Sequence, residues 1–379
     1  MPLFTLYGLA AALAYYVWAR LVPDMPGAWP GILFTALLVV TAALMPMGMA
    51  GQRLFSQPRA DTMAAAGLLA MGLFSSLFAF TVVRDALLLA GFAGSFVLES
   101  LVPTQRFLGI TALIAPSLGI GVTMAGFVNA RRTAGVVKVD VAVPGLPAAL
   151  DGFTIVQISD IHIGPTIRGR HLERIVDSVN LQNADVVAIT GDLVDGSVPQ
   201  LRDQVAPLAR LSSRNGSFFV TGNHEYYAGV LPWIAELRRL GIKVLLNEHG
   251  VIERGAAKLV LAGVTDFNAG HFDESHRSDP QAALAGAPPD ASVKVLLAHQ
   301  PRSAGAAAAA GFDLQISGHT HGGQFWPWNH FVRFQQPYTA GLHRLDELQV
   351  YVSRGTGYWG PPKRFGAPSE ITVLRLVAA

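Results

Sequence analysis

Four apolar stretches in the first third of the chain constrain its fold more than any other sequence feature. They lie at about residues 3–19, 31–51, 62–83 and 107–128, and each is close to the roughly 20 residues that a helix needs to cross a bilayer. Residues 1–129 contain only five Lys or Arg and four Asp or Glu, whereas the remainder contains 23 basic residues, 22 acidic residues and all 11 histidines. The sequence therefore predicts an N-terminal α-helical transmembrane segment, a membrane anchor of about four helices over 1–129, followed by a domain that faces water.

One part of this segment leaves alternatives open. Arg84 and Asp85 lie in an otherwise apolar stretch, where charge is costly and often functional, although a position at the end of the third span explains them equally well. We favour the end of the span. Residues 86–98 are too short to cross alone, so they either lie at the interface or extend the third helix, and a fifth span would invert the topology.

The distribution of basic residues predicts an orientation. With four spans, the N-terminus, the 52–61 loop and everything after residue 129 lie on one side of the membrane. That side carries five basic residues against three opposite, namely Arg53, Arg59, Arg131, Arg132 and Lys138 against Arg20, Arg84 and Arg106. The positive-inside rule thus favours a multi-pass protein of an inner or cell membrane whose larger domain is cytoplasmic. We expect no cleaved leader, and the scarcity of ionisable residues deep in the spans favours an anchor over a transporter.

From about residue 136 onward, short strands alternate with helical stretches. Strands are predicted at 136–143, 153–158, 185–190, 217–221, 243–246, 258–263, 293–298, 313–317, 348–353 and 370–377. Helices are predicted near 169–182, 199–213, 230–240 and 302–310. This alternation is typical of an α/β domain, here 150–379, preceded by a linker and first strand over 130–149. The strands are too many for one small parallel sheet, so two sheets between helices are expected.

Five short apolar runs in this domain each stop at an Asp, Asn or His. The motifs at these stops are Ser159-Asp160-Ile161-His162, Gly191-Asp192, Gly222-Asn223-His224-Glu225, His299 and Gly318-His319-Thr320-His321. In open α/β sheets, ligands bind where loops leave the carboxyl ends of the strands. Parallel strands could therefore bring all five loops to one edge, although the motifs are far apart in the sequence.

Each of these residues alone has a plain structural explanation, because Asp and Asn favour turns and helix N-caps. The same applies to the histidines that end no predicted strand, which are His171, His249, His271, His276, His330 and His343. For the combined set this explanation is poor, since Gly191, Gly222 and Gly318 suit close backbone approach to a site. The chain contains no cysteine, so a metal would bind through nitrogen and oxygen.

The five motifs, in this order, closely resemble those of the calcineurin-like metallophosphoesterases over roughly residues 150–378. The resemblance implies a four-layer sandwich of two β-sheets flanked by helices. It implies two divalent metal ions, one held by Asp160, His162, Asp192 and His321 and the other by Asp192, Asn223, His299 and His319. Asp192 would bridge the two ions, and His224 would be the catalytic residue that faces the substrate phosphate without binding metal.

The chemistry fits these residue types. Two cations about 3.5 to 4 Å apart can activate a water and neutralise charge during in-line attack on phosphorus. His224 could donate a proton to the departing oxygen. Mixed carboxylate, imidazole and amide ligands suit Mn²⁺, Fe or Zn²⁺, of which we favour Mn²⁺.

Later motifs indicate a membrane-associated branch of this family. Gly318–Gln324, Ser353–Gly357 and Pro368–Ile371 are similar to those of transmembrane metallophosphoesterase-domain proteins, a branch that includes phosphodiesterases and a UDP-2,3-diacylglucosamine pyrophosphohydrolase. An aromatic loop over 325–338 follows the last motif. It either packs in the core or forms a lid, or it dips into lipid or binds an acyl-bearing substrate. Arg354, Lys363 and Arg364 could bind a second phosphate, although solvated surface charge better explains the last two.

We therefore expect a membrane-anchored hydrolase of phosphodiester or pyrophosphate bonds whose partners are the bilayer and a phosphate-containing, lipid-linked substrate. A tethered phosphodiesterase or nuclease acting on soluble substrates is the first alternative. A non-catalytic membrane scaffold with structural metals is a remote one, because such a scaffold would not need His224. The net charge of +2 and the lack of Lys/Arg-rich runs argue against a nucleic-acid partner, and the sequence gives no oligomeric state.

Overall fold

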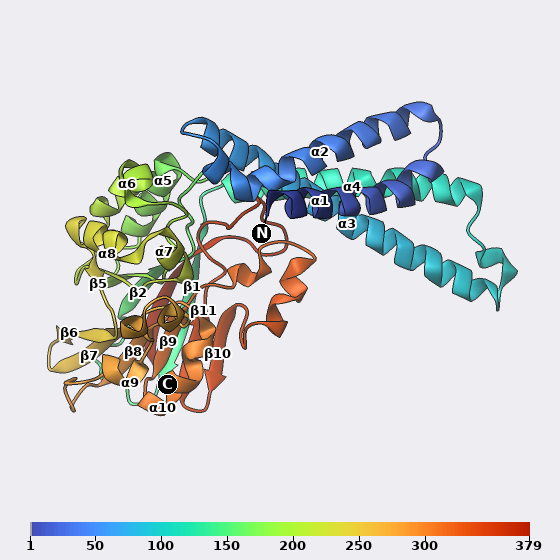
Figure 1. The fold of residues 1–379 in the computed structure, drawn as a ribbon. Helices are drawn as coiled ribbons and strands as arrows, with labels where there is room; N and C mark the ends of the chain where they lie inside the picture. Colours follow the sequence, from blue (N-terminus) through green and yellow to red (C-terminus); the bar gives the residue numbers. More distant parts are fainter. Residues whose placement is uncertain (1) are drawn as a thin grey trace. The chain divides into compact units, whose positions relative to one another are not determined.

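The computed structural model describes residues 2–379 and divides into two compact units. The first, here called the helical unit, comprises the described residues up to Arg131 together with Gly360–Phe365. The second, here called the α/β unit, comprises Arg132–Trp359 and Gly366–Ala379. Figure 1 shows both units along the chain. The short stretch 360–365 thus belongs to the helical unit although it lies near the end of the sequence.

The helical unit contains four long helices and two short 3₁₀ turns, η1 (Val22–Asp24) and η2 (Glu99–Leu101). The long helices are α1 (Leu3–Leu21), α2 (Ala28–Leu54), α3 (Arg59–Ser95) and α4 (Gln105–Arg131). They account for four candidate membrane spans, each long and apolar enough to cross a bilayer. Each expected apolar stretch therefore lies in its own helix. Most of residues 86–98 extend the third helix, which was one of the two alternatives.

Small residues bring α2 and α3 into close contact. A Cβ placed on Gly67 would lie 2.1 Å from the backbone nitrogen of Gly48, and one on Gly51 would lie 2.9 Å from that of Ala64. Helices without larger side chains at these points can pack backbone against backbone, as is common in membranes. The interface between α2 and α3 therefore depends on glycine.

Arg84 and Asp85 are paired inside the helical unit, and α3 does not end at them. Arg84 is only 3% exposed and its guanidinium lies 2.6 Å from the Asp24 carboxylate. Asp85 accepts hydrogen bonds from Tyr16 at 2.7 Å and from Arg20 at 2.9 Å. Each charge has an oppositely charged partner on α1 or η1, and the helix continues past both to Ser95. Their position at the end of the third membrane span, as distinct from the end of the helix, stays a prediction.

Segment 360–365 packs against α3 and α4 within the helical unit. Lys363 is 1% exposed, and its ammonium donates hydrogen bonds to the Ser76 hydroxyl and to the Gly72 carbonyl. A Cβ on Gly126 would lie 2.6 Å from the Lys363 Cγ, and the backbone of Arg364 donates to the Gly126 carbonyl at 2.9 Å. Lys363 and Arg364 are both buried, so the expectation of solvated surface charge is wrong.

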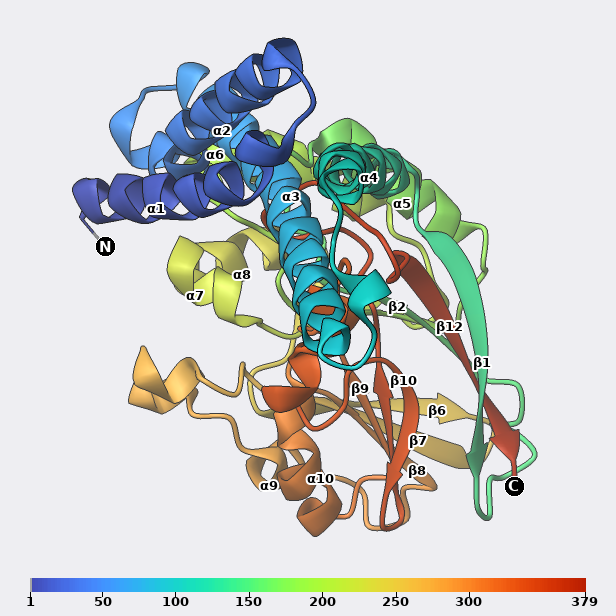
Figure 2. The same ribbon diagram turned by 90° about the vertical axis from the view of Figure 1, so that its right-hand side faces the viewer.

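The α/β unit contains two six-stranded sheets. The first runs in the order β1-β12-β2-β3-β4-β5, and Figure 2 shows β1 beside β12 at its edge. Its strands are β1 (Gly135–Val143), β2 (Thr154–Ile158), β3 (Val186–Ile189), β4 (Ser217–Phe219), β5 (Lys243–Val244) and β12 (Glu370–Ala378). β2, β3, β4 and β5 are parallel, so their carboxyl ends lie at one edge.

The second sheet runs in the order β10-β11-β9-β8-β7-β6. Its strands are β6 (Glu248–Arg254), β7 (Ala257–Gly263), β8 (Val293–Leu297), β9 (Leu314–Ser317), β10 (Gly341–Leu345) and β11 (Leu348–Val352). β7, β8, β9 and β11 are parallel, whereas the edge strands β6 and β10 are antiparallel to their neighbours. Both edge strands were missing from the prediction.

The two sheets pack face to face between helices. Ile155 and Val186 of the first sheet share one buried cluster with Leu261 and Leu297 of the second. The neighbouring Val260 points to the opposite face, where the second sheet packs against α10, because successive strand residues alternate sides. The helices flank the strands in Figure 1: α5 (Gly169–Asn180), α6 (Val198–Val205), α7 (Asn223–Ala228), α8 (Val230–Arg239), α9 (Pro280–Ala283) and α10 (Ala304–Ala310). The expected arrangement of two sheets flanked by helices is confirmed.

Candidate metal centre

All five motifs follow the carboxyl ends of strands that run parallel to a neighbour. Asp160 and His162 follow β2, Asp192 follows β3, and Asn223 and His224 follow β4. In the second sheet, His299 follows β8, and His319 and His321 follow β9. The structure brings the Asp and His side chains of these loops together in overlapping groups, as expected for loops that leave one edge of each sheet.

The first group contains Asp160, His162 and His321. The Nε2 atoms of His162 and His321 are 3.1 Å apart, and His321 Nε2 lies 3.5 Å from Asp160 Oδ1. Two imidazole nitrogens at this distance repel unless a proton or a cation lies between them. All three side chains are buried, so their donor atoms converge on a small volume shielded from water.

The second group contains Asp192, His299 and His319. His299 Nε2 lies 3.2 Å from Asp192 Oδ2 and 3.2 Å from His319 Nδ1. The other ring nitrogen, Nδ1 of His299, donates to the Thr190 carbonyl at 2.7 Å, so Nε2 is the nitrogen that faces the group. Asp192 also lies 3.9 Å from His162 Nε2, so one carboxylate reaches both groups.

Asn223 presents a buried acceptor without a protein partner. Its Oδ1 atom makes no hydrogen bond to any described residue. The flanking residues both approach Asp192, because the His224 amide donates to Asp192 Oδ1 and a Cβ on Gly222 would meet the same oxygen. A buried amide oxygen normally finds a donor or a cation. The residues present therefore fit two N/O-liganded divalent cations that share Asp192.

The surrounding protein groups shift the pKa values of Asp160 and Asp192 in opposite directions. Burial opposes ionisation of Asp192, but the charge and hydrogen bond of His299 outweigh it and hold the Asp192 pKa well below its usual range. For Asp160, burial dominates and raises the pKa. Burial likewise opposes protonation of His299, yet the Asp192 charge raises the pKa of His299 well above its usual value. Asp192 is thus the more acidic carboxyl of the two.

The backbone at these loops is unusual. Positive φ angles of 51° to 70° occur at five of the proposed ligands, which are Asp160, His162, Asp192, His319 and His321. Non-glycine residues adopt this region rarely and at an energetic cost, and such residues cluster at functional sites. The surrounding structure therefore holds these side chains in a geometry that the free backbone would avoid.

Glycine makes room for the ligands, as expected for the three motif glycines. A Cβ on Gly222 would lie 2.2 Å from Asp192 Oδ1, and one on Gly318 would lie 2.2 Å from Asp160 Oδ2. A Cβ on Gly191 would lie 2.8 Å from His299 Nδ1. Each separation is far below van der Waals contact, so none of these positions accepts a side chain without moving a proposed ligand.

His224 forms a third candidate group with His162 and Asp192, and its ring is oriented by a residue that sequence reasoning missed. Asp195 Oδ1 lies 2.6 Å from His224 Nδ1 and 3.0 Å from His162 Nδ1. Burial lowers the pKa of His224, but the hydrogen bond that His224 donates to Asp195 and the charge of Asp192 outweigh it and raise that pKa to about 9. The sequence Gly191-Asp192-x-x-Asp195 could have indicated Asp195, because a second carboxylate three residues after Asp192 lies in the same loop after β3.

Glu225 is a second residue whose role was not recognised. Its buried carboxylate accepts hydrogen bonds from the amides of Asp192 at 3.0 Å, Leu193 at 2.8 Å and Gly222 at 2.7 Å. Burial is the main reason that its pKa is raised to about 7. Glu225 therefore joins the loop after β3 to the loop after β4.

The part of the chain that contains the five motifs is similar to known proteins. Residues 153–323 match the calcineurin-like phosphoesterase family. An uncharacterized metallophosphoesterase of Aquifex aeolicus is 33% identical over 224 residues, which cover 59% of this chain and 84% of that protein. The chain belongs to the metallophosphoesterase family. Membership implies divalent metal ions.

Among relatives of this metallophosphoesterase, a Danio rerio transmembrane protein with metallophosphoesterase domain is 42% identical over 262 residues. The match covers 67% of this chain and 60% of the zebrafish protein. A solved structure with a similar fold, the 5′-nucleotidase precursor from Thermus thermophilus, has 15% identity and a TM-score of 0.38, covering 60% of this chain and 54% of that one.

The late motifs of this metallophosphoesterase support the loop after β2. The Thr356 amide donates to the Ser159 carbonyl at 2.7 Å, and the Thr356 hydroxyl donates to the Glu370 carbonyl at 2.9 Å. A Cβ on Gly357 would lie 2.1 Å from the Ile161 carbonyl oxygen. Arg354 pairs with the Glu370 carboxylate at 2.8 Å. These residues therefore brace the Asp160 loop.

The aromatic loop, residues 325–338, is only partly packed. Phe325 is buried, whereas Trp328, Phe331 and Phe334 are exposed, the last by 74%. Core packing therefore explains Phe325 but not the other three. The Arg333 guanidinium lies 5.2 Å from the centre of the Phe334 ring.

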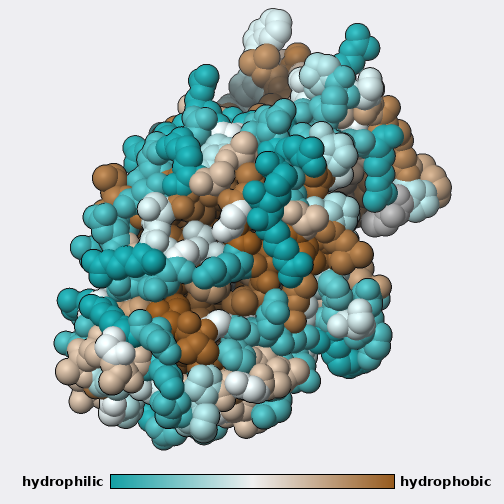
Figure 3. Space-filling model, turned by 90° about the vertical axis from the view of Figure 1, so that its left-hand side faces the viewer, coloured by the Kyte–Doolittle hydropathy of each residue, from teal (hydrophilic) through white to brown (hydrophobic). Residues whose placement is uncertain are grey.

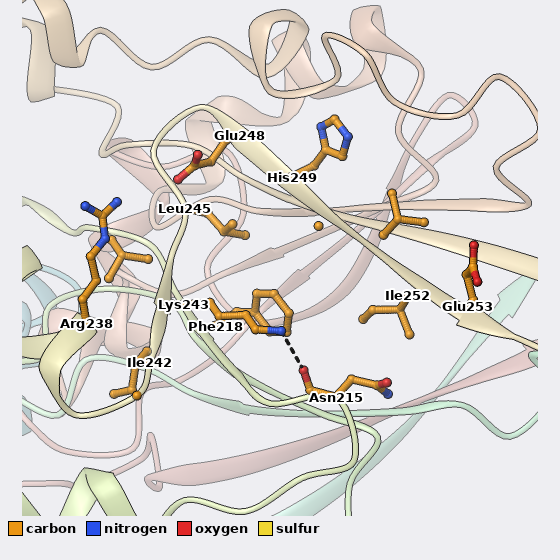
Figure 4. Close-up of a pocket in the computed structure, with 14 residues that line it drawn as sticks. Asn215, Phe218, Arg238, Ile242, Lys243, Leu245, Glu248, His249, Ile252 and Glu253 are labelled. Atoms are coloured by element: carbon orange, nitrogen blue, oxygen red, sulfur yellow. Dashed lines mark hydrogen bonds between the residues drawn. The ribbon is translucent and has the colours of Figure 1, made fainter.

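A pocket of about 610 Å³ lies apart from the motifs, beside β4, β5 and β6 (Figure 4). Its lining mixes Arg238, Lys243 and His249 with Glu248 and Glu253, and it contains none of the proposed ligands. On the face shown in Figure 3, hydrophobic side chains gather in hollows between hydrophilic ones. We assign the pocket no function, because its charges of both signs select no ligand.

Proposed function

We propose that this chain is a membrane-anchored, dinuclear-metal phosphohydrolase that cleaves phosphodiester or pyrophosphate bonds of a lipid-linked substrate. The observation that carries the proposal is the position of Asp192, which reaches both groups of donor atoms while His224 stands beside them. In this proposal Asp160, His162, Asp192 and His321 hold one ion, and Asp192, Asn223, His299 and His319 hold the other. Mn²⁺ is the proposed metal, and the bound ions supply an activated water and charge neutralisation.

Two residues of the chain supply and position the proton for the departing oxygen. His224 Nδ1 is held by Asp195, so its Nε2 is the nitrogen available to donate a proton to the departing oxygen. The raised pKa of His224 keeps the ring protonated at neutral pH. Asp195 also orients His162, so the same carboxylate positions a ligand and the acid.

Two features support a membrane and a lipid-linked substrate. The helical unit provides four helices that we propose as spans, with residues 1–129 as the anchor, 130–149 as linker and first strand, and 150–379 as the metallophosphoesterase domain. The exposed aromatics of the aromatic loop suit the headgroup level of a bilayer. The excess of basic residues on one side supports a cytoplasmic domain.

The proposed activity predicts a specific loss of function. Asp192→Asn and His224→Ala should abolish turnover, the latter by about 10²- to 10⁴-fold, because one removes the shared carboxylate and the other the acid. The assay uses detergent-purified full-length protein with Mn²⁺ against a model diester, a monoester and a UDP-linked glycolipid. His271→Ala is the matched control, since His271 is exposed and outside every candidate metal group.

Unchanged hydrolysis by both site variants would overturn the assignment. Preference for short nucleic acid over the glycolipid would favour a tethered phosphodiesterase or nuclease. Metal binding without hydrolysis of any of the three substrates would favour the scaffold.

The proposed orientation predicts the result of cysteine labelling. The natural chain has no cysteine, so a single Gln281→Cys variant reports the location of the α/β unit. Gln281 is exposed on α9, and we expect protection from an impermeant maleimide in intact cells and labelling after lysis. Labelling of intact cells would contradict a cytoplasmic domain.

A further inference from the structure

Two exposed aromatic rings flank the ring of His224. The Tyr227 centroid lies 5.3 Å from that of His224 and the Trp359 centroid 5.9 Å, with interplanar angles of 69° and 77°. Tyr227 is 65% exposed and Trp359 is 55% exposed. Each ring therefore packs at a steep angle to the imidazole of the proposed acid, and more than half of each residue is exposed.

Both rings are held by elements that also carry the site. Tyr227 lies on α7, three residues after His224, so the two side chains share one face of the helix. The backbone of Trp359 pairs with the side-chain amide of Gln324, its N–H donating at 2.8 Å and its carbonyl accepting at 2.8 Å. Gln324 comes three residues after His321, so Trp359 is positioned relative to the proposed ligands.

Phe272 extends this surface. Its centroid lies 5.6 Å from that of Tyr227, and the ring is 51% exposed. Single exposed aromatics are ordinary on protein surfaces, but aromatics in contact with one another beside a candidate site suggest a ligand surface. The Tyr227 hydroxyl and the Trp359 indole N–H can hydrogen-bond to water at the border of this apolar surface.

The chemistry of the site decides what this surface would bind. His224 Nδ1 is engaged by Asp195, so the leaving oxygen has to face His224 Nε2. The group attached to that oxygen then emerges beside the imidazole, whose ring contacts both Tyr227 and Trp359. We infer that Tyr227 and Trp359 form an apolar subsite that binds a hydrocarbon group on the leaving-group side of the substrate. This inference rests on the proposed phosphohydrolase function and names the part of the substrate that the site selects.

Short alkylphosphonates test the subsite without requiring turnover. Methyl-, propyl- and pentylphosphonate are too short to partition strongly into detergent, and their binding to full-length protein with Mn²⁺ is measured by calorimetry and by inhibition of diester hydrolysis. We expect the wild-type Kd to fall by about two- to fourfold for each added methylene, as apolar burial predicts. Tyr227→Ala and Trp359→Ala should flatten this dependence and leave the Kd of methylphosphonate within about twofold of wild type.

Trp359→Ala retains the backbone that pairs with Gln324, and Trp359→Phe should restore the chain-length dependence. Phe334→Ala is the matched control, because it removes another exposed ring, one that packs against Phe331 and Arg333 in the aromatic loop. Equal Kd values across the series in wild type, or an unchanged dependence in Trp359→Ala, would overturn the inference. Tighter binding of phenylphosphonate than of pentylphosphonate would also overturn it, in favour of a flat aromatic group.

The two proposals fail separately. Absence of hydrolysis with chain-length-dependent phosphonate binding would remove the proposed function and keep the apolar subsite. Hydrolysis together with phosphonate binding that does not depend on chain length would keep the proposed function and remove the apolar subsite.

Discussion

At the scale of single residues, the candidate site depends on side chains that serve two neighbours at once. Asp192 reaches both groups of donor atoms, and Asp195 hydrogen-bonds both His162 and His224. Glu225 accepts from the loops that follow β3 and β4. Sharing of this kind fixes the loops relative to one another, so that one substitution perturbs more than one function.

Asp195→Asn tests such sharing. The amide retains the size of the carboxylate and an acceptor oxygen but removes its charge, so the interaction with Asp195 that raises the pKa of His224 is weakened. We expect a 10- to 100-fold lower kcat with little change in melting temperature. A general acid works only when protonated, so activity falls as pH rises through the His224 pKa, and in Asp195→Asn this alkaline fall should move to lower pH.

A pH profile with an unchanged alkaline limb would show that Asp195 has only a structural role. Arg214 pairs with Asp185 away from the motifs, so Asp185→Asn controls for the loss of a buried carboxylate.

The sequence predicted these residues unevenly. The proposed ligands could be predicted because their motifs follow apolar strands, and this pattern is visible in the sequence alone. Glu225 lay within a recognised motif and Asp195 lay three residues after one, but their hydrogen-bond partners are visible only in the folded loops. Tyr227 and Trp359 are separated by more than a hundred positions and meet only at His224, so no local pattern signals them.

At the scale of elements, burial decided which strands could be predicted. β2, β3 and β8 are buried along almost their whole length and consist mostly of β-branched or aliphatic residues. The missed strands β6 and β10 lie at the two edges of the second sheet, are largely accessible and contain charged residues. Edge strands of this kind resemble loops in sequence.

The close contact of α2 with α3 makes a prediction at this scale. Gly67→Val should force the helices apart, because even a Cβ would lie 2.1 Å from the Gly48 nitrogen. We expect destabilisation of about 1–3 kcal/mol or more, measured as a lower melting temperature in detergent. Gly121→Val is the matched control, since a Cβ on Gly121 in α4 would have nothing within 4 Å. Equal melting temperatures for the two variants would contradict a glycine-dependent interface.

At the scale of the whole molecule, the helical unit is not continuous in sequence, because it contains residues 360–365. The composition changes near residue 129 and the α/β unit begins at Arg132, but no compositional signal marks Gly360–Phe365 as part of the helical unit. The reason is physical: Lys363 and Arg364 are charged residues, which normally remain in water. Their burial depends on specific carbonyl and hydroxyl partners that the sequence alone does not reveal.

An excised fragment of residues 132–379 should therefore show a local defect. It lacks Gly72, Ser76 and Gly126, so Lys363 loses the partners that bury it in the full chain. We expect trypsin to cleave after Lys363 or Arg364 much faster in the fragment than in the full-length protein, measured by mass spectrometry. Cleavage after the exposed Arg344 should proceed at similar rates in both. Equal protection of Lys363 would show that the segment is ordered without α3 and α4.

The interleaving of the two units also sets an order of events during synthesis. Residues 360–365 leave the ribosome after β1 to β11, whereas α3 and α4 are complete before the α/β unit has begun. The hydrogen-bonding positions at Ser76 and Gly126 must therefore wait until these residues have been synthesised to receive their partners. The helical unit is thus started before the α/β unit but completed only after most of the α/β unit has been made.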